Sequence, residues 1–278
     1  MAKSFVRSIL PIFAVLAFSL SLLGQTSAGQ RSGGSTPHPD FSGIWAGRVV
    51  STLAGAGAFA GGPEDAFGGI PAPGFSREEP QMLPWAQALY RSRRAGRSPI
   101  ERGLEGGDPT VYPYCQPSTF PRLYNFGGTF EFVHAPNVVY MLFEGHHHVR
   151  RIFLDGKRHL EGWAPSRMGV SHGRWDADTL VVETANILSL NRNGWLDGFG
   201  HPFTDSLKVT ERIRRTSRDT LQIDLLFDDR ETYTRPWPGR KVYQLRPDWD
   251  LVDSATCEDH WQEDFVRDMR QGRPRGGP

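Results

Sequence analysis

The chain has 278 residues and carries 32 Lys and Arg against 31 Asp and Glu, which gives a formal net charge of +1. A balance so close to neutral provides no electrostatic footprint for nucleic acid or for an anionic membrane surface, so neither is expected as a partner. About 250 residues after a leader segment suit one large β domain or two small domains.

The first 28 residues have the layout of a secretory signal peptide. A short positive stretch precedes an uncharged apolar run over 9–23, and small residues follow it up to Ala28. We predict cleavage after Ala28 and a periplasmic or secreted protein. A membrane anchor is the alternative, but the run is about 15 residues long and contains Pro11, whereas about 20 apolar residues are needed to cross a bilayer. No later run is long enough to span a membrane.

Composition divides the remaining chain. Residues 29–39 are polar and rich in Gly, Ser and Pro, which predicts a flexible lead. One domain is expected over 40–270, with a Gly/Pro-rich insertion at 51–83 whose first part is expected to run over the surface, because such a composition cannot bury a core. Residues 271–278 are expected to form a disordered tail.

Two segments have the pattern of short amphipathic helices. Residues 84–94 begin with Pro, carry Trp85 and Leu89 among their apolar positions and end in arginines, which predicts a peripheral helix. Residues 258–270 place Trp261, Phe265 and Met269 at spacings of four, which predicts a terminal helix.

Short apolar runs separated by turn residues predict strands. The first opens at Asp40 and reaches Val50. The others are 130–134, 138–143, 149–154, 170–175, 179–184, 207–215, 220–227 and 241–245. Because most are joined by short hairpin-like turns, this pattern of about nine strands favours a mainly β fold in which an antiparallel meander forms a closed or nearly closed barrel.

Only two cysteines occur, Cys115 and Cys257. In an oxidising compartment they allow one intramolecular disulfide, which would close a loop of about 140 residues and contribute on the order of 5 kcal/mol. Two buried free thiols are the alternative.

Three sequence motifs resemble those of a large group of uncharacterised exported bacterial proteins. They are Glu-Gly-His-His-His-Val-Arg-Arg at 144–151, Gly-Arg-Trp-Asp-Ala-Asp-Thr-Leu-Val-Val at 173–182 and Tyr-Thr-Arg-Pro-Trp at 233–237. The resemblance runs from about Asp40 to Cys257 and implies a lipocalin-like barrel, but no activity. The chain departs from the family pattern at 169–173, where it reads Gly-Val-Ser-His-Gly.

The densest group of ionisable residues lies between Glu144 and His159. Residues two apart share a face of a strand, so Arg150 and Arg151 are expected on opposite faces. Aromatic and ionisable residues in later segments extend the set. The ligand-binding candidates are Glu144, His147, Arg150, Arg151, Asp155, His159, Trp175, Glu183 and His201.

Three interpretations of this group remain open. A metal site would need His146 and His148 with Glu144, and no metal or other cofactor is expected. Acid–base chemistry would use a histidine held by a carboxylate and flanked by arginine. The third interpretation is a solvated strand end with ordinary salt bridges. The Gly-rich loop that carries Trp195, Asp197 and His201 is either a lid over the barrel mouth or a connector.

These patterns predict an exported protein that binds a small molecule in a polar His/Arg/Glu pocket. A cofactor-free lyase, isomerase or hydrolase is the rival, and an envelope interaction protein is a third possibility. The letters Gly-x-Ser-x-Gly occur at 169–173 without the helix that must follow a nucleophile elbow. The chain contains no dinucleotide, Walker or Cys-x-x-Cys motif, which argues against nucleotide and thiol redox chemistry.

Overall fold

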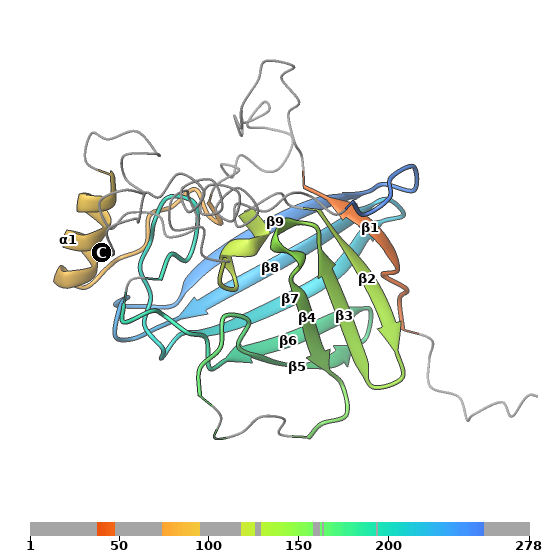
Figure 1. The fold of residues 1–278 in the computed structure, drawn as a ribbon, viewed down its shortest axis with the longest axis horizontal. Coiled ribbons are helices and arrows are strands. Elements are labelled where there is room, and N and C mark those ends of the chain that lie inside the picture. The colour runs from red at the N-terminus through yellow and green to blue at the C-terminus, as the bar shows by residue number, and fades with distance from the viewer. Residues whose placement is uncertain are drawn as a thin grey trace, which may run out of the picture. The chain divides into compact units, whose positions relative to one another are not determined.

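Nine strands close into one β-barrel (Figure 1). The computed structural model describes residues 38–47, 74–94, 118–125, 129–157, 162, 164–192 and 194–252, which all lie in one contact unit that begins at His38. The strands are β1 (Gly43–Ala46), β2 (Thr129–Ala135), β3 (Val138–Phe143), β4 (Val149–Phe153), β5 (Val170–Asp176), β6 (Thr179–Ala185), β7 (Lys208–Ser217), β8 (Thr220–Asp228) and β9 (Trp237–Leu245).

The mainly β barrel expected from the sequence is confirmed, and so is the peripheral helix. Helix α1 spans Pro84–Arg94, as predicted, and two short 3-10 helices, η2 (Arg122–Asn125) and η3 (Gly145–His147), complete the elements discussed below. The expected signal peptide and terminal helix, both cysteines and the tail lie outside the described residues. In the part of the chain that is described, no helix has the length and apolarity needed to cross a membrane.

The barrel departs from a purely antiparallel meander at one pair of strands. All neighbours are antiparallel except β4 and β5, which pair in parallel through Ile152 with Ser171 and Phe153 with His172. A closed ring of alternating directions needs an even number of strands, so nine strands require at least one parallel pair. The connection 154–169 therefore returns the chain to the end of the barrel at which β4 begins.

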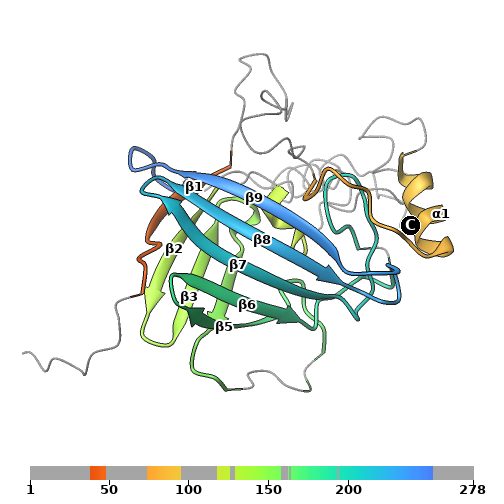
Figure 2. The ribbon, with the colours of Figure 1, turned by 180° about the vertical axis from the view of Figure 1, so that it is seen from behind.

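Strand directions give the barrel two different ends. At the hairpin end lie three two-residue turns, 136–137, 177–178 and 218–219, which fit tight antiparallel hairpins. At the opposite end, the loop end, β1 ends and β2 begins, and the longer connections 144–148, 186–207 and 229–236 join their strands there. Helix α1 also lies at the loop end, where Trp85 Nε1 donates to Glu231 O at 2.8 Å (Figures 1 and 2).

Aromatic side chains fill much of the barrel interior. Strand residues such as Phe130, Phe143 and Tyr243 are buried there together with Phe120 and Tyr124 of the segment 118–125. The ring centroids of Phe130 and Tyr243 lie 4.7 Å apart in an edge-to-face arrangement, which is favourable for aromatic pairs. The segment 118–125 thus contributes to the same core as the strands.

The Gly/Pro-rich insertion is tied to this core near its C-terminal end. Phe75, which was expected on the surface, is 0% exposed, and its ring centroid lies 5.0 Å from that of Phe227. A Cβ built on Gly239 would lie 2.7 Å from Phe75 Cβ, so the absence of a side chain at Gly239 makes room for Phe75. Residues 51–73 of the insertion lie outside the described residues.

Candidate functional site at the loop end

Arg150, one of the predicted ligand contacts, lies inside the barrel. Alternation along β4 turns Arg150 and Ile152 inward and exposes Val149 and Arg151. Arg150 is 1% exposed. Its guanidinium faces Glu211, which alternation along β7 likewise turns inward between Val209 and Ile213.

The Arg150 network satisfies its own polar groups. Arg150 Nη1 donates to Glu211 Oε1 at 3.0 Å and Nη2 donates to Glu211 Oε2, a bidentate pair. Tyr124 Oη accepts from Nη1 at 2.7 Å and donates to Glu211 Oε1 at 2.6 Å. Ser171 and Thr184 accept further hydrogen bonds from the guanidinium. Burial raises the pKa of Tyr124 well above its ordinary value, so the phenol remains a neutral donor.

The other predicted contacts are spread over both ends and the outer wall of the barrel. Arg151 and Glu183 are exposed on the outer faces of β4 and β6. Trp175 lies near the hairpin end, where its ring stacks on His38 with centroids 4.6 Å apart. Asp155 follows β4 at that same end and accepts from Lys157 N at 3.1 Å.

Two of the remaining candidates lie in the β3–β4 connection, at the loop end. Glu144 precedes η3, and His147 is exposed with a positive φ of 50°. His159 lies outside the described residues. The cluster that is dense in the sequence is therefore dispersed in space. Of the nine candidates, Arg150 belongs to the buried network in the barrel and His201 to a second network in the connection 186–207.

His201 belongs to the second network, which is built on a turn in the connection 186–207. Asp197 is fully buried, and its Oδ1 accepts the backbone N–H groups of Phe199, Gly200 and His201 at 3.0, 3.0 and 3.2 Å. An Asp side chain that bonds the backbone just after it is typical of such turns. The other oxygen, Oδ2, lies 2.7 Å from His201 Nδ1.

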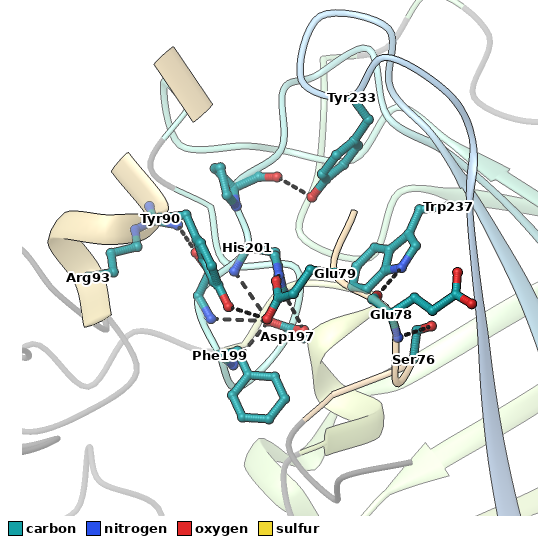
Figure 3. A network of polar contacts seen from close by, with 12 residues as sticks. Ser76, Glu78, Glu79, Tyr90, Arg93, Asp197, Phe199, His201, Tyr233 and Trp237 are labelled. Carbon is teal, nitrogen blue, oxygen red and sulfur yellow. Dashed lines mark hydrogen bonds and ion pairs between the residues drawn. The ribbon is translucent and has the colours of Figure 1, made fainter. Parts of the chain in front are cut away.

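The opposite edge of the His201 ring meets a carboxylate from a distant part of the chain (Figure 3). His201 Nε2 lies 2.8 Å from Glu79 Oε2, and Tyr90 Oη in α1 donates to Glu79 Oε1 at 2.8 Å. The Tyr90 and His201 rings stack with centroids 4.3 Å apart. The Trp237 ring, at the start of β9, lies 4.9 Å from His201.

The charges of this network are fixed at neutral pH. Burial by itself would lower the pKa of His201, but Asp197 and Glu79 outweigh it and raise the pKa to about 9. The hydrogen bond from His201 is the largest cause that lowers the pKa of Glu79. His201 is therefore an imidazolium that donates from both nitrogens, and Glu79 is an ionised carboxylate.

Glu79 is the member of this network that meets water. The His201 side chain is 2% exposed, whereas that of Glu79 is 62% exposed. One hydrogen bond reaches each carboxylate oxygen, which leaves acceptor capacity on the solvent side. Buried groups thus hold the anionic Glu79 carboxylate in a fixed position at the surface. We call Glu79 together with Tyr90, Asp197 and His201 the Glu79 site.

No local pattern in the sequence marks Glu79 or Tyr90 as site residues. They are separated from His201 by 122 and 111 positions, and Glu79 lies in the Gly/Pro-rich insertion 51–83, for which no site residue was predicted. Glu211 lies in the predicted strand 207–215, but nothing in the sequence around it marks it as the buried partner of Arg150. Within the described ranges, no group of three or more His, Cys, Asp or Glu side chains is arranged to hold a metal ion.

Comparison with known proteins assigns no family: no family model, no curated protein and no solved structure matches the chain. A functional interpretation therefore has to come from the geometry of the Glu79 site and of the barrel interior.

Proposed function

We propose that this is an exported protein that binds a small organic cation at the loop end of its barrel, with the Glu79 carboxylate as the anchor. The observation that carries the proposal is an exposed carboxylate held in place by a buried imidazolium and a phenol. A carboxylate positioned in this way pays little ordering entropy when it accepts a hydrogen bond from a ligand.

The neighbouring side chains support a cationic ligand. The Arg94 guanidinium carbon lies 5.1 Å from the Phe199 ring centroid and 5.6 Å from that of Tyr90, and the Arg94 charge contributes to the lowered pKa of Glu79. The protein thus already places one planar cation on these two rings and near this carboxylate. A ligand with an amidinium, guanidinium or ammonium group would use the same cation–π and charge interactions.

Acid–base catalysis, the alternative function, is less well supported at this site. A general acid or base is most effective when its pKa lies near the working pH. Here the pKa of His201 is raised to about 9 and the pKa of Glu79 is lowered. Both pKa values therefore move away from neutral pH, and both groups are charged at that pH. These shifts favour a fixed charge arrangement, as a binding site requires.

Benzamidine and benzamide provide a matched pair of probes, because they share shape and differ in charge. We expect isothermal titration calorimetry to show that the exported protein binds benzamidine more tightly than benzamide. Glu79→Gln should weaken benzamidine binding by about ten- to hundredfold, since a charge-assisted hydrogen bond is worth about 1.5–3 kcal/mol. Glu78→Gln is the control, because Glu78 is an exposed neighbour in the same segment.

Equal affinities for the two probes, or equal effects of the two glutamate variants, would overturn the proposal. Arg94→Ala adds a second discriminating result. If Arg94 occupies the place of the ligand cation, its removal should strengthen benzamidine binding about two- to fivefold, since an exposed cation–π contact contributes about 0.5–1 kcal/mol. Weaker binding in Arg94→Ala would contradict this placement.

Export and the disulfide are part of the same proposal. Cleavage after Ala28 and pairing of Cys115 with Cys257 predict a mature chain that begins at Gly29 and weighs two hydrogens less than the reduced form. N-terminal sequencing and intact mass measurement of protein recovered from the periplasm check both points. A retained leader or two alkylatable thiols would contradict them.

A further inference from the structure

The outer surface of the barrel differs in character between its two sides. Alternation along β7 turns charged side chains to solvent, as expected for the outer face of a sheet: Lys208, Arg212 and Arg214. Alternation along β3, on the opposite side of the barrel, turns apolar and aromatic side chains outward: Val138, Tyr140 and Leu142 (Figures 1 and 2). An apolar outer surface of this kind is typical of an interaction site.

The apolar character of β3 continues onto the strands beside it. Val133 of β2 is 39% exposed and Val149 of β4 is 52% exposed. In Figure 1 the middle of β2, β3 and β4 faces the viewer, and no other described strand or helix lies in front of it. We call the following outward side chains the β1–β4 wall: Ile44, Glu131, Val133, Val138, Tyr140, Leu142, Val149 and Arg151.

The β1–β4 wall carries one acid and one base, which lie on either side of β3. Glu131 on β2 pairs across the sheet with Leu142, whereas Arg151 on β4 pairs with Tyr140, two residues further along β3. The two charges thus occupy opposite ends of a diagonal across the wall. In the described part of the chain, Arg151 contacts the Phe153 ring at 5.7 Å and neither charge forms an ion pair.

A second copy of the chain is the occupant that fits this arrangement. In a symmetric dimer every contact occurs twice, because a two-fold axis relates the two copies. An axis that lies in the interface and crosses the Glu131–Arg151 diagonal at a right angle brings Arg151 of each copy opposite Glu131 of the other. Tyr140 and Leu142 then lie between the two charge pairs.

We propose that the mature protein forms a symmetric dimer through its β1–β4 wall, with an apolar centre and two reciprocal Glu131–Arg151 ion pairs. Interfaces between identical subunits are more apolar than the rest of a protein surface, and complementary charges fix the register in which the subunits meet. The wall lies on the side of the barrel and the Glu79 site lies at its loop end. The dimer therefore does not rest on the cation site, and separate measurements test the two proposals.

The experiment reverses one charge of the pair at a time and follows the mature protein by sedimentation velocity over a range of concentrations. We expect the wild type to form a dimer. Glu131→Arg and Arg151→Glu should each raise the dimer dissociation constant about tenfold or more, because either change places like charges opposite each other at two positions of the interface. An equimolar mixture of the two variants should recover the dimer, since both pairs in the mixed dimer again have opposite charges.

Two matched controls separate this contact from a general effect of charge. Glu183→Arg and Arg214→Glu make the same changes at exposed outward positions of β6 and β7, and neither should weaken the dimer. Circular dichroism checks that all four variants fold.

Three results would overturn the proposal. The first is a wild type that stays monomeric at every concentration, as expected if another part of the chain covered the wall. The second is dimerisation of Glu131→Arg and Arg151→Glu that is as strong as that of the wild type or of the controls. The third is a mixture of these two folded variants that remains monomeric.

Discussion

The Arg150 network and the Glu79 site both combine buried charges with a tyrosine hydroxyl, but they end differently. Around Arg150, the cation, its carboxylate partner and Tyr124 are all enclosed by the barrel. Around His201, the buried Asp197 lies at one edge of the imidazolium and the largely exposed Glu79 at the other. The first network is closed on itself, whereas the second carries a fixed charge to the surface.

This difference separates a structural role from a binding role. A buried ion pair whose partners are fully hydrogen-bonded has no remaining capacity for a ligand, and it ties together strands that are distant in sequence. A network that leaves carboxylate acceptor sites in water retains that capacity. Arg150 is therefore best understood as a part of the core that joins β4 to β7.

The largest expected change in stability follows from breaking the Arg150 network. Arg150→Met or Glu211→Leu alone should lower the free energy of unfolding by about 3–5 kcal/mol, because each leaves an uncompensated buried charge. The double variant Arg150→Met/Glu211→Leu should be less destabilised than the sum of the single variants. Urea unfolding followed by circular dichroism measures all three.

A double variant as unstable as that sum would show that the pair is not coupled and would weaken the structural assignment. Arg212→Met is the matched control, because Arg212 is half-exposed on the outer face of the same strand and its pair with Asp176 is also half-exposed. Its effect should stay below about 1 kcal/mol.

A smaller change in stability, which depends on pH, is expected at the Glu79 site. The pKa of His201 is about 9 in the folded protein against an ordinary value of 6.5. Its contribution to stability is therefore fully present below about pH 6.5 and is lost as the pH rises through 9, an effect on the order of 3 kcal/mol. Burial lowers the pKa of Lys241 to about 7, so its contribution changes in the opposite direction over this window.

The test therefore compares the free energy of unfolding of the wild type with that of His201→Gln at each pH. The stability advantage of the wild type over His201→Gln should shrink between pH 6.5 and pH 9.5, as measured by urea unfolding at each pH, while the Lys241 contribution cancels. His134→Gln is the control, because burial lowers the pKa of His134 and moves its titration out of this window. A constant difference between wild type and His201→Gln would mean that His201 is not charged in the folded protein.

Local patterns in the sequence were sufficient to predict most of the fold. Alternation and turn residues predicted the strands and the short hairpin-like turns that join most of them, and the proline and arginine positions predicted the bounds of α1. The parallel β4–β5 pair was missed because hairpin spacing says nothing about how the connection 154–169 returns the chain. Phe75 was missed because the composition around it is typical of a surface loop.

The site was harder to predict, since its contacts join segments that are far apart. Strand alternation correctly separated Arg150 from Arg151, but it carries no information about which carboxylate meets Arg150. His201 was chosen with Asp197 in a Gly-rich loop, where an Asp that bonds the following backbone is a recognisable pattern. Nothing local connects that loop to Glu79, which reaches it only after the insertion docks on the barrel.

The smallest expected effect concerns the hydroxyl of Tyr90. It distinguishes a group that orients the Glu79 carboxylate for binding from a group that only stabilises the fold. Tyr90→Phe keeps the ring that stacks on His201 and removes one hydrogen bond to Glu79, so stability should fall by about 1 kcal/mol. Tyr140→Phe, on the outer face of β3, is the matched control. If the hydroxyl orients Glu79, the Tyr90 variant should also weaken benzamidine binding in calorimetry, whereas a purely structural hydroxyl would change stability and leave that affinity unchanged.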